Sequence, residues 1–229
     1  RIKVDGSPIK DSEIVAFLRL AKNNIIDIKS TFFETTTAMA LYHFNQCKVD
    51  IAIIETGLGG RLDSTNVIKP MLSIITRISL DHMDILGDNL TSIAKEKAGI
   101  IKESIPVVIA QQALEVEKVL HNASKEKNTT LIKVETPKHI TLKPSGTEFE
   151  YRDKGYSSSL IGSHQAFNAV LAIESVNQFF KTISEKSIED GLKNVLWRGR
   201  IQVLRDRFIY DVGHNSDGIK MLLNSIKRL

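Results

Sequence analysis

Apolar runs rich in isoleucine and valine alternate along this chain with segments of helical periodicity, and this alternation constrains the fold more than any other feature. Short runs that are almost wholly apolar are typical of strands buried on both faces, as in a parallel sheet covered by helices. The pattern predicts strands at 49–54, 71–78 and 105–110, and helices at 11–23, 31–47, 91–101, 113–127 and 163–180. A parallel α/β sheet is the fold class that this order favours.

The pattern changes in the second half of the chain. Residues 130–160 form short alternating runs broken by Pro137 and by the turn at 144–146, which predicts antiparallel hairpins at the edge of the sheet. A further hairpin is expected at 201–210 and an amphipathic helix at 215–229. The antiparallel elements therefore come after most of the predicted parallel sheet.

We place a domain boundary near Trp197. Residues 1–196 then form a central domain, and residues 197–229 begin a second one. A segment of about 30 residues is too short to bury a core of its own. The second domain is therefore expected to be incomplete in this sequence.

Composition excludes several classes of protein. Hydrophobic residues make up 42% and charged residues 25% of the 229, which is typical of a globular protein. The net charge is +4, but acidic residues interleave the basic ones, so small anions are better candidate partners than nucleic acid. No apolar run approaches the roughly 18 residues of a membrane span, and residues 1–10 lack the core of a signal peptide. We expect a cytoplasmic, monomeric protein with no membrane partner, in which the single cysteine, Cys47, is a buried structural thiol.

Polar residues that follow strands are the first candidates for chemistry, because ligands bind beyond the carboxyl ends of the strands in open α/β sheets. Glu55 follows the first predicted strand and opens a glycine-rich stretch, His82 follows the second, and Asp211 follows the strand before the last helix. Each alone has a common structural explanation, such as a turn cap or a hydrogen-bonded histidine. A carboxylate and an imidazole at one sheet edge also suit Mg²⁺, which binds phosphates through its remaining positions.

Lys97 lies on the apolar face of its predicted helix, at helical spacing from Ile93 and Ile100. Its stem could pack there while the ammonium reaches water. Alternatively, loss of hydration could favour the neutral amine and make Lys97 reactive. Periodicity leaves both interpretations open.

Ordered sequence blocks then point to a family. The first three are ETGLGGRLDSTN at 55–66, LDHMDILG at 80–87 and IAKEKAGII at 93–101, and the later ones are GSHQAFNA at 162–169, WRGR at 197–200 and DVGHN at 211–215. Together they resemble the folylpolyglutamate synthase and dihydrofolate synthase family, which is related to the Mur ligases. The resemblance spans nearly the whole chain. It implies a Mur-ligase-like central ATPase domain, present in part, followed by the start of a Rossmann-like C-terminal domain.

The resemblance implies an ATP-dependent ligase that joins L-glutamate to folate or dihydropteroate through an acyl phosphate. Glu55 and His82 match the family's Mg²⁺ ligands, and Lys97 matches a lysine that is carried as a carbamate and also serves the metal. With Arg200, which would neutralise charge on the transferred phosphoryl group, His82 and Lys97 are the implied catalytic residues. Carbamate formation requires the neutral amine, which would explain a lysine on an apolar face.

Other matches concern ATP and the acceptor substrate. Asn168, Arg200 and Asp211 match ATP-contacting positions, and His214 lies beside them in the block that begins the C-terminal domain. Asp63 matches a position that contacts the pteridine-bearing substrate in some members. A turn-stabilising role for Asp63 is an equally good explanation.

The sequence departs from the family in one important respect. No Gly-Lys-Ser P-loop is present, and residues 1–6 resemble the segment that follows that loop in the family. We therefore expect an incomplete copy, about half of a usual member, that is inactive alone. The alternatives are a non-catalytic remnant that binds folate or nucleotide, and a Mur-type ligase that acts on cell-wall precursors.

Overall fold

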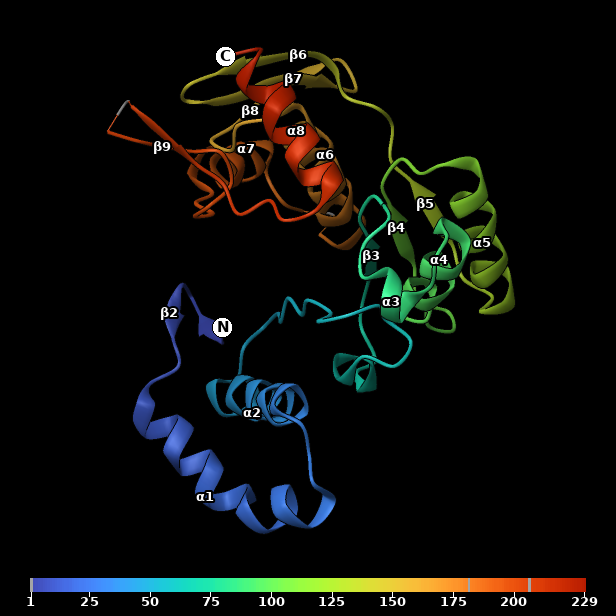
Figure 1. The fold of residues 1–229 in the computed structure, drawn as a ribbon, viewed down its shortest axis with the longest axis vertical. Helices are drawn as coiled ribbons and strands as arrows, with labels where there is room; N and C mark the ends of the chain where they lie inside the picture. The colour runs from blue at the N-terminus through green and yellow to red at the C-terminus, as the bar shows by residue number, and fades with distance from the viewer. Residues whose placement is uncertain (1, 181, 206) are drawn as a thin grey trace. The chain divides into compact units, whose positions relative to one another are not determined.

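The computed structural model describes residues 2–180, 182–205 and 207–229. The chain divides into two compact units, Arg1–Lys69 and Pro70–Leu229 (Figure 1). The second unit contains a parallel sheet joined by helices, so the predicted α/β class is confirmed. Within the described ranges, no helix combines the length and the apolar character that crossing a bilayer requires.

The first unit is built around two helices. Its elements are the antiparallel pair β1 (Lys3–Val4) and β2 (Ser7–Pro8), the helices α1 (Asp11–Ile28) and α2 (Phe32–Cys47), and the short 3₁₀ helix η1 (Ser64–Val67). Helix α1 packs against α2, and α2 also contacts η1. The buried residues of this small core are Ile2, Phe17 and Met39.

The start of α2 forms as its sequence predicts. The Thr31 hydroxyl accepts a hydrogen bond from the Glu34 backbone N–H at 3.2 Å, and the Glu34 carboxylate accepts one from the Thr31 N–H at 2.7 Å. This reciprocal capping box satisfies two N–H groups that the helix itself leaves without partners. All of its groups lie within four consecutive residues, so local sequence was sufficient to predict it.

Two expectations for this unit are wrong. Residues 49–54 pair with no strand among the described residues, and the side chains of Ile51 and Ile53 are 47% and 93% exposed. An apolar run favours a buried strand, but it does not supply the neighbouring strand that backbone hydrogen bonding requires. Cys47 is exposed rather than buried, because it occupies the last turn of α2, beyond the part of the helix that packs.

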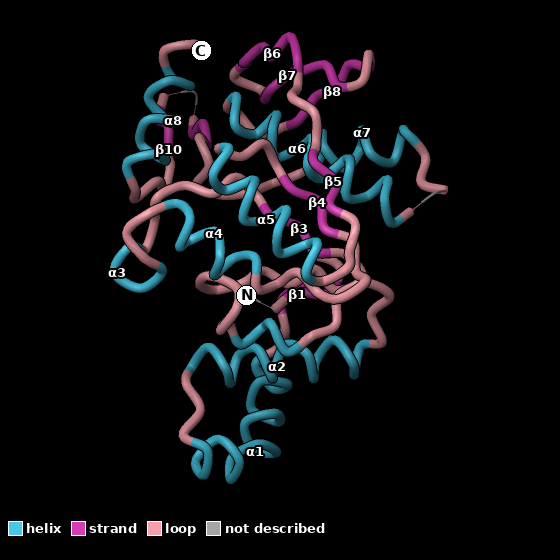
Figure 2. The backbone as a smooth tube through the Cα atoms, turned by 90° about the vertical axis from the view of Figure 1, so that its right-hand side faces the viewer, coloured by secondary structure: helices cyan, strands magenta, loops and turns pink. Residues whose placement is uncertain are grey.

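The second unit begins with the parallel sheet. Strands β3 (Ser73–Ile75), β4 (Val107–Ile109) and β5 (Leu131–Lys133) pair in parallel in that order. The short helix α3 (Met83–Leu86) and helix α4 (Leu90–Ala98) lie between β3 and β4 in the chain, and α5 (Leu114–Glu126) connects β4 to β5. The three strands lie side by side in Figure 2, and α4 packs against α5. Every residue of the central strand β4 is fully buried.

Beyond β5 the chain forms the expected antiparallel hairpins. Strands β6 (Lys138–Lys143), β7 (Gly146–Tyr151) and β8 (Lys154–Ser158) pair in sequence order. The prediction for residues 130–160 is wrong in two parts, since β5 joins the parallel sheet instead of a hairpin, and the hairpins form a sheet of their own instead of extending the edge of the parallel one. The two-residue turn between β7 and β8 places Arg152 and Asp153 at φ values of 48° and 60°, as hairpin turns of this length require.

Helix α6 (Ser163–Phe179) is the centre of the second unit. It contacts β4 of the parallel sheet and also β6, β7 and β8 of the antiparallel sheet. Helix α7 (Glu185–Asn194) packs beside β8. The core around α6 includes Val108, Phe149, Tyr156, Ala166, Val170 and Ile173. Both sheets therefore bury their apolar faces against one helix.

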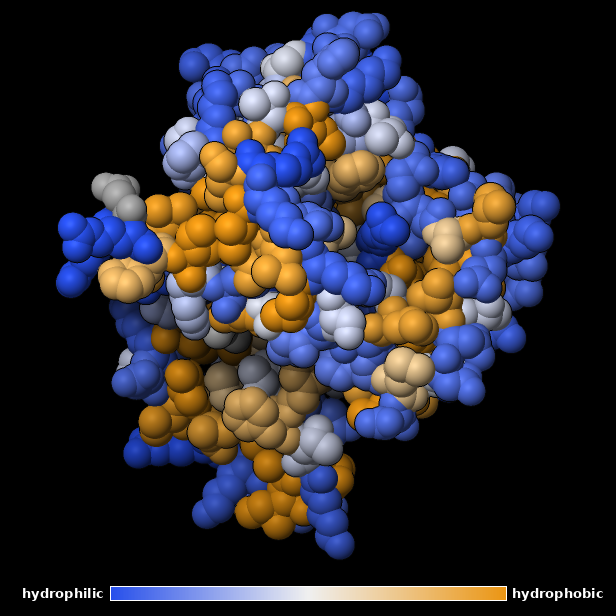
Figure 3. All heavy atoms as spheres, turned by 45° about the horizontal axis from the view of Figure 1, so that its top comes forward, coloured by the Kyte–Doolittle hydropathy of each residue, from blue (hydrophilic) through white to orange (hydrophobic). Residues whose placement is uncertain are grey.

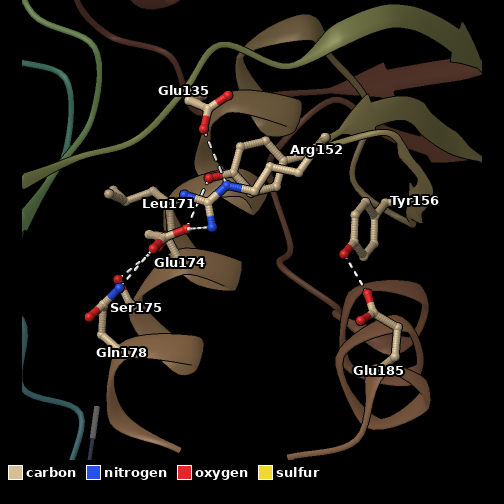
Figure 4. A network of polar contacts seen from close by, with 9 residues as sticks. Glu135, Arg152, Tyr156, Leu171, Glu174, Ser175, Gln178 and Glu185 are labelled. Carbon is tan, nitrogen blue, oxygen red and sulfur yellow. Dashed lines mark hydrogen bonds and ion pairs between the residues drawn. The ribbon is translucent and has the colours of Figure 1, made fainter. Parts of the chain in front are cut away.

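A buried carboxylate attaches α6 to the β7–β8 hairpin (Figure 4). Glu174 is 2% exposed and accepts hydrogen bonds from the Tyr151 hydroxyl at 3.0 Å and from Gln178 Nε2 at 2.8 Å. Its Oε2 also lies 3.0 Å from Nη1 of Arg152, which in turn donates from Nε to Glu135 at 3.3 Å. The buried charge thus has several partners, without which its burial would be costly.

The last segment of the second unit packs against α6. It contains the hairpin β9 (Gln202–Leu204) and β10 (Phe208–Tyr210) and the helix α8 (Ser216–Ile226). Helix α8 packs against α6, and Arg228 donates hydrogen bonds to the Ser163 hydroxyl and to the Ile140 carbonyl at 2.5 and 3.0 Å. On the face drawn in Figure 3, hydrophobic residues gather at the left. In the hairpin, Phe208 is exposed. The domain boundary near Trp197 stays a prediction.

Candidate functional site

The predicted site residues fall in both units. Glu55 and Asp63 belong to the first unit. The others, His82, Lys97, Asn168, Arg200, Asp211 and His214, belong to the second.

Asp63 organises the glycine-rich loop that follows Glu55. Its Oδ2 accepts hydrogen bonds from the backbone N–H groups of Gly57 and Leu58 at 2.8 and 2.9 Å. Its Oδ1 accepts from the backbone N–H and the hydroxyl of Thr65 at 2.9 and 2.5 Å, which caps η1. Burial raises the pKa of Asp63, but these hydrogen bonds outweigh it and hold the pKa below its ordinary value. The turn-stabilising role is thus present, while Glu55 beside the loop is exposed.

His82 begins α3 in the left-handed conformation, with φ 49°. Its side chain is 51% exposed, and its Nε2 lies 4.0 Å from Oδ1 of Asp81. The Asp81 carboxylate accepts from the His82 backbone N–H at 2.9 Å and from Asn215 Nδ2 at 2.9 Å. Burial raises the pKa of Asp81, but these hydrogen bonds and the nearby histidines bring it below its ordinary value.

The contact between Asp81 and Asn215 joins residues 134 positions apart. Asn215 also caps α8, because its Oδ1 accepts from the Gly218 backbone N–H at 2.8 Å. Its amide therefore connects the loop after β3 to the start of α8. Sequence reasoning gave neither Asp81 nor Asn215 a role, although both lie in the blocks that carry the family resemblance.

Asp211 holds two loops together. Its Oδ2 accepts from the Ile201 backbone N–H at 2.8 Å, and its Oδ1 accepts from the Gly213 N–H at 2.6 Å. The Val212 N–H donates to the Gly199 carbonyl at 3.0 Å. Gly199 has φ +76°, and a Cβ there would lie 2.8 Å from the Val212 side chain. The loop that carries Arg200 is therefore fixed against the start of the final segment.

The first turn of α6 contributes to the same neighbourhood. Burial lowers the pKa of His164, and the charges of Asp211 and Arg200 act on this imidazole in opposite directions. Asn168 lies one turn further along α6 and donates to Gln165 Oε1 at 3.3 Å. The structure thus places Arg200 and Asp211 near His164, which sequence reasoning did not select, and Asn168 one turn further along the same helix. The signal for His164 was its place in the GSHQAFNA block.

An apolar cavity of about 350 Å³ opens beside this turn. Helices α6 and α7 and the end of β8 form its walls. Its apolar lining includes Ala169, Ile173, Ile188 and Leu192, and its polar lining includes Gln165 and Asn168. A cavity of this size with few polar groups is suited to a flat, mostly apolar ring system.

The side chains of Lys97 and His214 take no part in the hydrogen bonds described above. Lys97 is partly buried on α4, whose residues Ile93 and Ala94 are fully buried, and α3 with His82 at its start packs against α4. His214 is exposed, with Nδ1 3.2 Å from the Val212 carbonyl. Across the described part of the chain, no three or more histidine, cysteine, aspartate and glutamate side chains are grouped around one metal position.

Comparisons with known proteins agree with this architecture. Residues 11–176 match the family model described as the Mur ligase middle domain. The chain is 36% identical to a dihydrofolate synthase/folylpolyglutamate synthase of Bacillus subtilis, over all of this chain and 58% of that protein. It is also similar to two solved structures. One is a complex of folylpolyglutamate synthase (FPGS) with AMPPCP and folate, with a TM-score of 0.92 and 33% identity. That match covers 99% of this chain and 60% of the other.

The other is folylpolyglutamate synthase of Mycobacterium tuberculosis complexed with ADP and AMPPCP, with a TM-score of 0.90 and 32% identity. That match covers 98% of this chain and 56% of the other. The chain therefore spans somewhat more than half the length of the relatives it matches.

Proposed function

The chain belongs to the Mur ligase family, and on that premise we propose that it is the nucleotide-binding part of a ligase that joins L-glutamate to folate or dihydropteroate. In this reaction the substrate carboxylate attacks the γ-phosphorus of ATP, which forms an acyl phosphate and releases ADP. The amine of L-glutamate then attacks the acyl carbon, and phosphate leaves as the amide forms. We also propose that the enzyme is monomeric and cytoplasmic and that its substrates are small molecules.

One observation carries the proposal. The first turn of α6 lines the apolar cavity, and the Arg200 loop fixed by Asp211 lies near His164 in that turn. An aromatic base suits the cavity, and Arg200 supplies the positive charge that phosphoryl transfer requires. Relatives solved with AMPPCP or ADP support the binding of a nucleotide by this chain.

Glu55, His82 and Lys97 are the proposed Mg²⁺ ligands. The half-exposed imidazole of His82 can accept a metal, and the exposed carboxylate of Glu55 is the oxygen donor that Mg²⁺ prefers. Lys97 is partly buried beside fully buried residues of α4, and we propose that its amine carries the carbamate that the family resemblance implies. When bound, the metal would neutralise charge on the phosphates. Asp63, whose carboxylate orders the adjacent loop, is proposed to contact the pteridine-bearing substrate.

Calorimetric titration of AMPPCP into the 229-residue chain tests the nucleotide site. We expect Arg200→Ala to weaken binding at least tenfold, because a cation beside the phosphates is lost. Arg198→Ala, two residues away at an exposed position, serves as the matched control and should bind like the unchanged chain. Equal affinities for all three proteins would show that Arg200 does not contact the nucleotide.

The ligase chemistry has a separate test. We expect the protein encoded by the complete gene to release ADP only when L-glutamate and a folate or dihydropteroate are both present. The Lys97→Arg variant keeps a positive charge but cannot form the carbamate, and we expect it to lose this activity. Absence of glutamate-dependent ADP release with every folate tried would overturn the proposed reaction.

A further inference from the structure

Two positions of the proposed site lie on backbone in the left-handed conformation. His82 has φ 49°, and Ile201, which directly follows Arg200, has φ 45°. This conformation is uncommon for residues other than glycine, and for a β-branched residue such as isoleucine it is a steric outlier. Backbone of this kind persists only where the surrounding structure holds it, and it is concentrated at functional sites. The contacts that hold these two positions therefore determine where His82 and Arg200 lie.

Asp81 holds His82 and connects it to the start of α8. Oδ1 of Asp81 accepts a hydrogen bond from the His82 backbone N–H at 2.9 Å, and Oδ2 accepts one from Asn215 Nδ2 at 2.9 Å. The orientation of the Asn215 amide is fixed, because its Oδ1 accepts from the backbone N–H of Gly218 at 2.8 Å, and a backbone N–H can only donate. The amide nitrogen of Asn215 is therefore the group that faces Asp81.

Asp211 holds Ile201 in the same way. Its Oδ2 accepts from the Ile201 N–H at 2.8 Å, and its Oδ1 accepts from the Gly213 N–H at 2.6 Å. Ile201 is 2% exposed, so an unpaired N–H at this position would be costly. Residues 211–215, which contain both Asp211 and the partner of Asp81, form what we term the coupling segment. Both left-handed positions are thus held through this one segment.

The bond between Asp81 and Asn215 is not required by the local structure at either end. Capping of α8 uses only the oxygen of Asn215, so the bond from its nitrogen is an additional contact. The Asp81 side chain is 35% exposed and can be hydrated instead, so burial does not force the pairing. What the bond does is fix the loop that carries His82 relative to the loop that carries Arg200.

This relative position matters for phosphoryl transfer. The imidazole of His82 is a proposed Mg²⁺ ligand, and the guanidinium of Arg200 is proposed to neutralise charge on the phosphates. A metal ion and a cation stabilise the same phosphates most effectively when both are positioned before the reaction. Two such groups on separate loops need a contact that joins the loops.

We propose that Asp81 and Asn215 are positioning residues whose hydrogen bond couples the binding of Mg²⁺ at His82 to the binding of the nucleotide phosphates at Arg200. The inference rests on the proposed nucleotide and metal sites and adds to them the contact that makes them act together. Asp81 acts through the backbone of His82, and Asn215 acts through the coupling segment.

Calorimetric titration of AMPPCP into the 229-residue chain, with and without Mg²⁺, measures this coupling. Its measure is the Mg²⁺ factor, the ratio by which Mg²⁺ tightens AMPPCP binding. We expect this factor to be about ten in the unchanged chain, the size of effect that one hydrogen bond to a charged group can transmit. In Asn215→Asp the new carboxylate can still cap α8, but it faces the Asp81 carboxylate and the like charges repel each other. The Mg²⁺ factor should fall to near one.

Exchange of the two side chains restores the bond in the opposite direction. In the double variant Asp81→Asn, Asn215→Asp, the amide at position 81 accepts from the His82 N–H through its oxygen and donates through its nitrogen to the carboxylate at position 215. The other oxygen of that carboxylate caps α8, and the net charge equals that of the unchanged chain. The Mg²⁺ factor should return to about ten, which neither a charge effect nor a loss of packing would produce.

Asp81→Asn alone preserves the test if Asn215→Asp does not fold. Its amide oxygen is needed by the His82 N–H, so its nitrogen faces the nitrogen of Asn215, and two donors cannot pair. The bond is then lost without any repulsion between charges. The Mg²⁺ factor should again fall to near one.

Hydrogen exchange in the absence of any ligand gives a second readout. The His82 N–H should exchange about fivefold faster in Asn215→Asp, because one supporting hydrogen bond is lost, and at the original rate in the double variant. The Gly218 N–H should keep its rate in both, since the cap remains. Asn89→Asp is the matched control: Asn89 also caps a helix and donates to an aspartate, but this is its neighbour Asp88, so no distant segments are joined. It should change neither the Mg²⁺ factor nor the exchange of the His82 N–H.

The outcomes separate the site from its coupling. Failure of the unchanged chain to bind AMPPCP would overturn the proposed nucleotide site and the coupling with it. AMPPCP binding that Mg²⁺ does not tighten would overturn the coupling alone. The same conclusion would follow from a folded Asn215→Asp variant that keeps the original Mg²⁺ factor, or from a lost factor that the double variant does not recover.

Discussion

Removal of the buried carboxylate of Glu174 provides a quantitative test of how the second unit is held together. In Glu174→Ala, the Tyr151 hydroxyl loses its acceptor inside the core, which costs about 1–3 kcal/mol. Arg152 has a side chain 50% exposed and can turn to water, so its loss of a partner adds little. The cavity left by the removed side chain adds to this cost, so we expect the free energy of unfolding to fall by about 2–4 kcal/mol in total.

Thermal unfolding followed by circular dichroism measures this effect. For a protein of this size, about 1 kcal/mol corresponds to roughly 2–4 °C, so Tm should fall by roughly 4–16 °C. Glu148→Ala removes an exposed carboxylate paired with Lys143 on the same antiparallel sheet, and this control should change Tm little.

A double-mutant cycle separates the orphaned hydroxyl from the other losses. Tyr151→Phe removes the hydroxyl itself, so adding it to Glu174→Ala should cost less than the two single effects summed, by about 1–2 kcal/mol. Strict additivity, or a Glu174→Ala protein as stable as Glu148→Ala, would refute the assignment of Glu174 as the anchor of α6 to the hairpin.

Further predictions concern pH and capping. Burial and Glu174 raise the pKa of Tyr151 to about 12, so between pH 10 and 12 the unfolded chain loses this proton first. Stability measured in urea should therefore fall as pH rises, less steeply in Tyr151→Phe. The pH dependence due to Asp63 runs in the opposite direction, because the pKa of this carboxyl is lower in the folded protein than its ordinary value of 3.8. The ionised carboxylate therefore stabilises the fold at pH values above 3.8, and this contribution should be lost as the pH falls through the lowered pKa. The Asp63→Asn variant should lack this pH dependence. Asn215→Ser should keep the cap of α8 but lose the hydrogen bond to Asp81, whereas Asn215→Ala should lose both. Only the alanine variant should therefore show faster hydrogen exchange in the first turn of α8.

Local features of this protein follow from the sequence by itself. The capping box of Thr31 and Glu34 lies within four residues, and helix periodicity repeats within each segment, so both can be recognised without knowing the rest of the fold. The alternation of apolar runs and helices likewise predicted the parallel strands β3 and β4, because their burial on both faces leaves a continuous apolar pattern.

The tertiary structure decided which distant groups meet. Residues 49–54 carry the pattern of a buried strand but have no strand partner among the described residues, because pairing depends on a second segment. The 134 positions between Asp81 and Asn215 leave no periodic signal, and nothing near Glu174 in the sequence identifies Tyr151 as its donor. Sequence specifies local conformation and chemical type, whereas polar partnership depends on the packing that brings the groups together.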